Sequence, residues 1–374
     1  MSAYALLARA WGAEVRGWDR TRTPYLEHLE GIEVEISDEL PEPPADWEPF
    51  VSTAFAGRLR GKSRADLLAE LVSLRESIVV AGAHGKTTTA GMIAFCLERL
   101  GREPAWLIGA DVPQLGGNAG AGKGWLVAEG DESDRTIASL RPRIAVVTNV
   151  DLDHHATFGS RAEVEELFAQ WLEAVPEVVR GEELAPYEGP LAVVGEHNRL
   201  NAACALAALE LTGVSRAEAE PILAEFGGAA RRLERRGEAG GVEVYDDYAH
   251  HPAEIAATLA ALSDGGRLVV LFQPHLYSRT RHLARELAAA LARADSVAVA
   301  DVYPAREEPV AGVTGKLVVD ALTELRPGMP VAWTPSIDQG AQFLAGFVRA
   351  GDRAVTIGAG DVDRAAELLL EALR

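Results

Sequence analysis

The sequence predicts an α/β protein with three domains. Short β-branched runs alternate with helical patterns along most of the 374 residues, which is typical of parallel α/β sheets. The length corresponds to two or three domains of about 100–200 residues each. The alternation also starts again after about residue 76 and after the segment FGGAARR. We therefore expect domains at residues 1–76, 77–226 and 227–374.

Each expected domain has its own series of elements. In the first we expect helices at Tyr4–Trp11, Thr23–Glu30 and Arg64–Ser73 and strands at Glu14–Gly17 and Ile32–Ile36. In the second we expect strands at Ile78–Ala81, Trp125–Glu129, Ile144–Thr148 and Leu191–Val194, with helices at Lys86–Leu100, Arg161–Ala174 and Asn198–Thr212. In the third we expect strands at Val242–Tyr245, Leu268–Phe272, Ser296–Ala300 and Ala354–Ile357. The glycine-rich stretch Gly116–Gly124 predicts a loop.

Charge and composition exclude several classes of protein. The chain has 36 Lys+Arg against 56 Asp+Glu, a formal charge of −20, which disfavours general nucleic-acid binding. No apolar run approaches the ~20 residues of a membrane span, so we expect no membrane insertion. Cys96 and Cys204 cannot form a disulfide framework, which favours a cytoplasmic protein. The sequence leaves the oligomeric state open.

A phosphate-binding loop is predicted at Gly82-Ala83-His84-Gly85-Lys86-Thr87-Thr88, between a strand and a helix. The glycines allow backbone N–H groups to approach a phosphate, and the helix start favours negative charge. Lys86 would reach the terminal phosphates, and Thr87 would hold Mg²⁺. The alternative is an ordinary glycine-rich turn. Lys86 argues against it, because only four lysines occur in a chain that otherwise uses arginine.

Acidic and imidazole side chains follow two further strands. Glu129 ends one strand and is the carboxylate best placed for the metal, whereas we expect Glu132 and Asp134 to be solvated caps of the next helix. His154 lies in Asn149-Val150-Asp151-Leu152-Asp153-His154-His155, after the next strand. Oxygen ligands with an imidazole suit Mg²⁺ or Mn²⁺ rather than structural zinc.

The remaining candidates lie in three later segments. Asn198 and Asn201, three residues apart on one helix, present amides that can read an adenine edge, although capping is the alternative for Asn198. Arg231-Arg232 precedes the third domain. The loops Asp246–Pro252 and Phe272–Arg279 each close a strand, which is where α/β sites lie.

These segments together resemble the Mur ligases. The matching stretches are AGAHGKTTT, EGDESD, TNVDLDHHATFG, GEHNRLNA, ARRLERRGE, DDYAHHPAE, FQPHLYSRTR and DVYPAREEPVAGVTG, in this order. The resemblance is strong over about residues 64–374 and weak over 1–63. DDYAHHP and FQPHLYSRT are typical of the branch that adds alanine and its close relatives.

The resemblance implies a fold and a reaction. The fold would comprise a Rossmann-like UDP-binding domain, a central P-loop ATPase domain and a Rossmann-like C-terminal domain. The reaction would be ATP-dependent ligation of L-alanine to the carboxylate of UDP-N-acetylmuramate through an acyl phosphate, in peptidoglycan precursor synthesis. ATP and Mg²⁺ would be required. The alternatives are a recycling ligase that attaches a peptide to the same sugar nucleotide and a non-catalytic nucleotide-binding paralogue.

The resemblance also implies residue roles. Lys86 would contact the γ-phosphate, while Thr87, Glu129 and His154 would hold the metal. The ATP site would include the loop 82–88 with Asn198, Asn201, Arg232 and Asp247. The incoming amino acid would meet Tyr248, His250, His275 and Arg279.

The chain also departs from the family pattern. The family's first strand and glycine turn, which seat the uridine diphosphate, would precede Met1, so we expect the first domain to be a truncated, incomplete UDP-binding domain. The central domain is short between Trp171 and Leu191, and Leu276 stands where an arginine is common.

Overall fold

The computed structural model describes residues 1–23, 26, 29, 31–152, 157–305 and 307–374, which form two compact units. The first unit contains Met1–Ala192 and Arg199–Gly227, and thus the first two predicted domains. The second contains Val193–Asn198 and Gly228–Arg374. Both units are built on parallel sheets with helices, which confirms the predicted α/β class. None of the helices in the described ranges is both long and apolar enough to cross a membrane.

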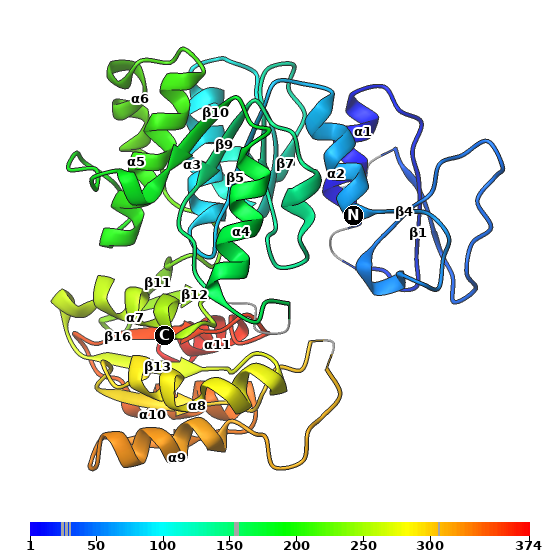
Figure 1. Cartoon of the computed structure of the whole chain (residues 1–374). Helices are drawn as coiled ribbons and strands as arrows, with labels where there is room; N and C mark the ends of the chain where they lie inside the picture. The colour runs from blue at the N-terminus through cyan, green and yellow to red at the C-terminus, as the bar shows by residue number, and fades with distance from the viewer. Residues whose placement is uncertain (24–25, 27–28, 30, 153–156, 306) are drawn as a thin grey trace. The chain divides into compact units, whose positions relative to one another are not determined.

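A six-stranded sheet forms the centre of the first unit (Figure 1). Its order is β10-β9-β5-β8-β6-β7, and every neighbouring pair is parallel except β6 with β7. The strands are β5 Ser77–Ala81, β6 Ala105–Val112, β7 Gly117–Gly120, β8 Leu126–Glu129, β9 Ile144–Val147 and β10 Glu177–Arg180. The carboxyl ends of β5, β8 and β9 therefore meet at one edge of the sheet.

Helices complete this unit. They are α3 Lys86–Arg99, α4 Arg161–Leu172, α5 Glu196–Leu211, which begins within the second unit, and α6 Arg216–Leu223. The Ser160 side chain accepts from the backbone N–H of Glu163 and caps α4. A cluster of buried apolar side chains from α4, such as Phe168 and Trp171, packs with Val79 and Ala128 of the sheet.

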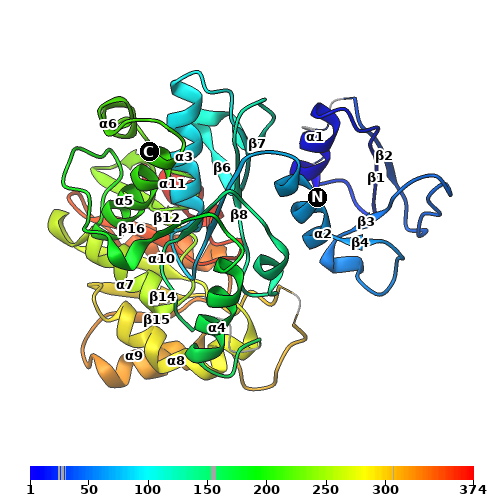
Figure 2. The ribbon, with the colours of Figure 1, turned by 45° about the horizontal axis from the view of Figure 1, so that its top comes forward.

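The N-terminal segment has two small parallel sheets rather than one. They pair β1 Arg16–Asp19 with β2 Glu33–Ile36, and β3 Phe50–Val51 with β4 Lys62–Ser63. Figure 2 shows them with α1 Ser2–Ala10 and α2 Arg64–Ser73. Leu7 of α1 and Leu71 of α2 join the core cluster of the larger sheet. This segment is therefore anchored to the central sheet by its helices.

The second unit is a complete open sheet with helices on both faces. Its order is β11-β12-β16-β13-β14-β15, parallel except for β11 with β12. The strands are β11 Glu234–Ala239, β12 Val242–Asp247, β13 Leu268–Phe272, β14 Ser296–Val299, β15 Val331–Trp333 and β16 Arg353–Ile357. One core cluster contains α7 Pro252–Ala261, α8 Tyr277–Leu291 and α9 Lys316–Leu325, and the other contains α10 Ile337–Phe347 and α11 Arg364–Ala372.

Two predicted elements were wrong. Leu191–Val194 is not a strand; its residues alternate between partial and full exposure, and none of the strands in the described ranges pairs with it. The glycine-rich stretch is not only a loop, because Gly117–Gly120 pairs with β6 as strand β7. Most of the helix expected at Thr23–Glu30 lies outside the described residues, since 24–25, 27–28 and 30 are not described.

Candidate active site

The loop between β5 and α3 requires both of its glycines. Gly82 and Gly85 have φ values of 135° and 85°, in the region that side chains disfavour. A Cβ at Gly82 would lie 2.3 Å from Oγ1 of Thr148, and one at Gly85 would lie 2.3 Å from Oδ1 of Asn201. Asn201, which the sequence placed at the ATP site, therefore lies against the loop.

Asn149 holds this loop from the end of β9. Its carbonyl accepts from Ala83 N at 3.3 Å, and its side chain bonds both His84 N (3.0 Å) and His84 O (2.9 Å). The Thr148 hydroxyl also donates to His84 O at 2.6 Å. Two loop N–H groups are thus used to fix the loop's shape. Sequence reasoning gave Asn149 no role, although its position just after the strand beside β5 was the available signal.

Lys86 is held by a buried carboxylate. Its ammonium group donates to Gly82 O at 2.5 Å and to Glu132 Oε1 and Oε2 at 3.0 and 3.1 Å. Burial opposes the charge of Lys86, but Glu132 outweighs it and holds the pKa of the lysine above its ordinary value. Glu132 is only 2% exposed, so its expected role as a solvated cap is wrong. The sequence could not show this pairing, because the two residues are 46 positions apart.

Thr87 and Glu129 lie together beside Lys86. The Thr87 hydroxyl donates to Glu129 Oε2 at 3.1 Å, and Glu129 Oε1 accepts from Gly109 N at 2.5 Å. A hydroxyl and a carboxylate oxygen at this distance match the ligand types that Mg²⁺ prefers. His154, the third expected ligand, lies outside the described residues. Within the described part of the chain, no three His, Cys, Asp or Glu side chains group into a metal site.

Thr88 and Asn198 are both buried. Thr88 lies in the first turn of α3. α5 begins at Glu196, two residues before Asn198, so Asn198 is not the residue that starts the helix. Its side-chain amide donates to Val194 O at 2.7 Å. Asn198 is therefore not the N-cap residue of α5, and the capping alternative is wrong.

Asp247 lies at the carboxyl end of β12 in the second unit. Its side chain accepts from Leu233 N at 2.8 Å and from Ala249 N at 2.7 Å. Burial raises the pKa of this carboxyl group to about 6, despite the two N–H donors and the nearby Arg232.

Four aromatic rings lie close together in the loops that follow β12, β13 and β14 of the second sheet. Ring centroids of Tyr248 and His250 are 5.5 Å apart, as are those of His250 and His275, and His275 stacks on Tyr303 at 6.1 Å. Arg279 Nη1 lies 3.2 Å from His275 Nδ1. The structure thus brings together all four residues predicted for the amino acid. Sequence reasoning missed Tyr303, although it stands in the family-like stretch DVYPAREEP.

The two adjacent arginines at the start of the second unit differ in their surroundings. The guanidinium of Arg232 lies over the ring of Tyr248, with its carbon 4.9 Å from the centroid. Arg231 donates to Asp246, Gly358 and Gly360 within the unit. The guanidinium carbon of Arg231 also lies 5.3 Å from the centroid of the Tyr248 ring, so both arginines lie beside this predicted ligand residue, and Arg231 in addition bonds the two strand ends.

Comparison with known proteins assigns the family. The domain families "Mur ligase middle domain" and "Mur ligase, glutamate ligase domain" match residues 80–180 and 231–360. A protein of Renibacterium salmoninarum named UDP-N-acetylmuramate–L-alanine ligase is 40% identical over 380 residues, covering 87% of this chain and 80% of the relative. One of Rubrobacter xylanophilus with the same name is 37% identical, covering 100% and 97%.

Solved structures agree in fold. The UDP-N-acetylmuramate–alanine ligase MurC of Thermotoga maritima matches with a TM-score of 0.79 at 24% identity, covering 99% of this chain and 96% of that one. A murein peptide ligase of Psychrobacter arcticus matches with a TM-score of 0.64 at 23% identity, covering 100% and 96%. The chain belongs to the Mur ligase family, the ATP-dependent ligases that form amide bonds.

Proposed function

We propose that this Mur ligase joins L-alanine to the carboxylate of UDP-N-acetylmuramate at the expense of ATP, as a step of peptidoglycan precursor synthesis. One observation carries the proposal: the loop Gly82–Thr88 presents Lys86 beside the Thr87–Glu129 pair in a chain whose nearly full-length relatives bear that activity in their names. Because the reaction consumes ATP and a sugar nucleotide, we place it in the cytoplasm.

The first half of the reaction belongs to the loop after β5. Lys86 would leave Glu132 to neutralise the γ-phosphate as the muramate carboxylate attacks it, giving an acyl phosphate and ADP. Mg²⁺, held by Thr87, Glu129 and, by family resemblance, His154, would supply further neutralisation of the phosphate charge. Asn198 and Asn201 would contact the nucleotide. By the family resemblance, Arg232 and Asp247 would also contact the nucleotide.

The second half belongs to the ring cluster after β12 and β13. Arg279 would receive the carboxylate of L-alanine, since a guanidinium matches carboxylate geometry. Tyr248, His250 and His275 would enclose the small side chain and leave the amine free to react. The amine displaces phosphate from the acyl carbon, forms the amide and loses a proton.

The test is phosphate release with ATP, Mg²⁺ and UDP-N-acetylmuramate, with and without L-alanine. We expect release to depend on alanine, with serine and glycine as weaker substrates, because a difference of one small group is worth about 1–3 kcal/mol. Faster turnover with a tripeptide than with alanine would favour the recycling ligase. Nucleotide binding without turnover on either amine would favour the non-catalytic paralogue.

A further inference from the structure

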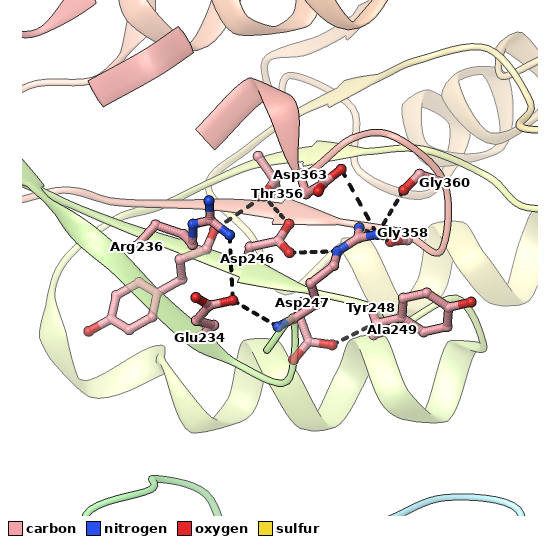
Figure 3. Close-up of polar contacts among 12 residues, drawn as sticks. Glu234, Arg236, Asp246, Asp247, Tyr248, Ala249, Thr356, Gly358, Gly360 and Asp363 are labelled. Carbon is pink, nitrogen blue, oxygen red and sulfur yellow. Dashed lines mark hydrogen bonds and ion pairs between the residues drawn. The ribbon is translucent and has the colours of Figure 1, made fainter. Parts of the chain in front are cut away.

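Arg231 joins three segments of the second unit through one side chain. Figure 3 shows the surroundings of its partners Asp246, Gly358 and Gly360. Its Nε donates to Asp246 Oδ2 at 2.9 Å, at the end of β12. Its Nη1 and Nη2 donate to the carbonyls of Gly360 (2.8 Å) and Gly358 (2.7 Å), in the turn after β16. The arginine itself stands in the segment that precedes β11. The guanidinium therefore fixes that segment to two strand ends at once.

The backbone of Arg231 extends this network to the predicted ligand residues. Its carbonyl accepts from Tyr248 N at 2.7 Å, and its own N–H donates to Glu234 Oε2 at 2.8 Å. Gly358 N in turn donates to Asp247 O at 2.9 Å. The backbone of Tyr248 is thus bonded to Arg231 itself. The backbone of Asp247 is bonded to Gly358, whose carbonyl accepts from the Arg231 side chain.

The segment around Arg231 adopts a strained conformation. Arg231 and Leu233 have φ values of 57° and 51°, in the left-handed region that non-glycine residues rarely adopt. Such residues persist only where the surroundings determine their conformation, and they are frequent at functional sites. The guanidinium contacts of Arg231 and the bond from Leu233 N to Asp247 supply that constraint.

We propose that Arg231 is a positioning residue for the ligase reaction, holding Tyr248 and the neighbouring Arg232 in place through its contacts with Asp246, Gly358 and Gly360. This inference rests on the proposed function for its catalytic consequence. It assigns to Arg231 no contact with ATP or alanine; Arg231 acts by fixing residues that make such contacts.

Lysine cannot replace Arg231 in this network. Three acceptors in different directions are met by the planar fork of one guanidinium, whereas an ammonium group on a flexible stem is a point charge. Asp246 is 0% exposed and also accepts from the hydroxyl of Thr356, so its carboxylate is fixed in a single orientation. The charge can be kept by lysine, but the geometry is lost.

The experiment compares Arg231→Lys with Arg353→Lys. Arg353 is a matched control, because its side chain is 22% exposed against 20% for Arg231 and it also bonds one carboxylate and one carbonyl, those of Glu243 and Leu262. It lies at the amino end of β16, away from the predicted ligand residues. We expect Arg231→Lys to raise the KM for L-alanine about tenfold or more, because small misplacements at a site cost this much. The KM for UDP-N-acetylmuramate and all constants of Arg353→Lys should stay within about twofold.

Hydrogen exchange provides a readout independent of turnover. Arg231→Lys should speed amide exchange in peptides covering residues 245–250 and 357–361, and Arg353→Lys should not. If the wild type does not ligate alanine, the proposed function is wrong. Amide hydrogen exchange then tests by itself whether Arg231 holds these segments in place. If Arg231→Lys does not fold, Asp246→Asn, which keeps the shape and removes the charge, should show the same changes. A folded Arg231→Lys with wild-type alanine KM and wild-type exchange overturns the proposal.

Discussion

Lys86 is one of four lysines in the chain, and its ammonium group lies between Glu132 and the carbonyl of Gly82. We expect Lys86→Ala to lose well over a hundredfold in turnover, because removing one preorganised charge from such a site costs about 3 kcal/mol or more. Alanine-dependent phosphate release measures this. Lys316→Ala is the control, since the ammonium group of Lys316 forms an exposed ion pair with Asp320 on α9. Near-normal turnover of a folded Lys86→Ala would contradict the assignment of the loop.

Glu132 gives Lys86 a partner as long as no phosphate is bound. Glu132→Gln should lower the unfolding temperature, because breaking a buried ion pair by removing one partner costs about 3–5 kcal/mol. ATP should then raise the unfolding temperature more in the variant than in the wild type, since the phosphate supplies the missing negative charge. Thermal unfolding with and without ATP measures both effects.

Glu165→Gln provides the comparison for Glu132→Gln, because Glu165 forms an exposed pair with Arg161 on α4. Exposed pairs of this kind contribute about 0–1 kcal/mol. Equal effects of the two substitutions would show that Glu132 is not the buried partner of Lys86.

Asp247 makes stability depend on pH. Its pKa rises from an ordinary 3.8 to about 6 in the folded protein. The folded state therefore binds the proton more tightly than the unfolded chain, and the stability gained is complete below about pH 4 and lost as pH rises through about 6. The difference corresponds to about 3 kcal/mol. As the pH is raised from about 4 to about 6, the unfolding temperature of the wild type should decrease relative to that of Asp247→Asn. A constant difference between the two proteins would contradict the shifted pKa.

At the scale of elements, strand β7 depends on having no side chain at Gly120. A Cβ there would lie 2.2 Å from ring atoms of the buried Trp106 on β6. Gly120→Ala should destabilise the first unit by about 1–3 kcal/mol, the usual cost of overpacking. Gly346→Ala is the control, because nothing lies within 4 Å of a Cβ there and helix α10 favours alanine. Chemical unfolding followed by circular dichroism measures both. An unchanged midpoint for Gly120→Ala would contradict this packing.

Contacts between neighbouring strands explain which strands the sequence could predict and which it could not. Buried runs such as SIVVA of β5 and LVVLF of β13 are continuous and β-branched or apolar, and both strands formed where predicted. β7 reads GNAG and has almost no intrinsic strand preference; its pairing with β6 and the close approach of Trp106 create it. Leu191–Val194 has the opposite character: its residues are apolar, but it joins neither of the two six-stranded sheets that the structure describes. Tertiary contacts decided both elements.

The residues of the candidate site also divide into those that the sequence could predict and those whose roles depend on the fold. Residues in the glycine loop were predictable because the spacing itself encodes the backbone path. The role of Glu132 was not predictable, because its pairing with Lys86 depends on strands that meet only in the folded sheet. The adjacent arginines Arg231 and Arg232 show the same point. The sequence shows two equal charges, and in the fold both guanidinium groups lie over the ring of Tyr248, but Arg231 also donates to the buried Asp246.

At the scale of the whole molecule, the residues assigned to the γ-phosphate and the metal belong to one compact unit, and those assigned to the amino acid belong to the other. Lys86, Thr87 and Glu129 belong to the first unit, while Tyr248, His250 and Arg279 belong to the second. The chain as a whole carries a charge of −20, so anionic substrates must be held by these local groups rather than by a general field. A substitution among the residues assigned to the amino acid should impair alanine ligation and spare formation of the acyl phosphate.

Arg279→Gln tests this division. Formation of the acyl phosphate needs ATP and UDP-N-acetylmuramate but no alanine, so it can be followed alone as the transfer of label from ADP into ATP. We expect Arg279→Gln to keep this exchange within a few-fold and to lose alanine-dependent ligation by roughly a hundredfold, because the carboxylate of the amino acid loses its guanidinium partner. Lys86→Ala should lose both activities, since its charge acts on the phosphate in the first step. If Arg279→Gln lost the exchange as completely as Lys86→Ala does, Arg279 would act on the phosphate rather than on the amino acid, and the assignment of the ring cluster to alanine would be wrong.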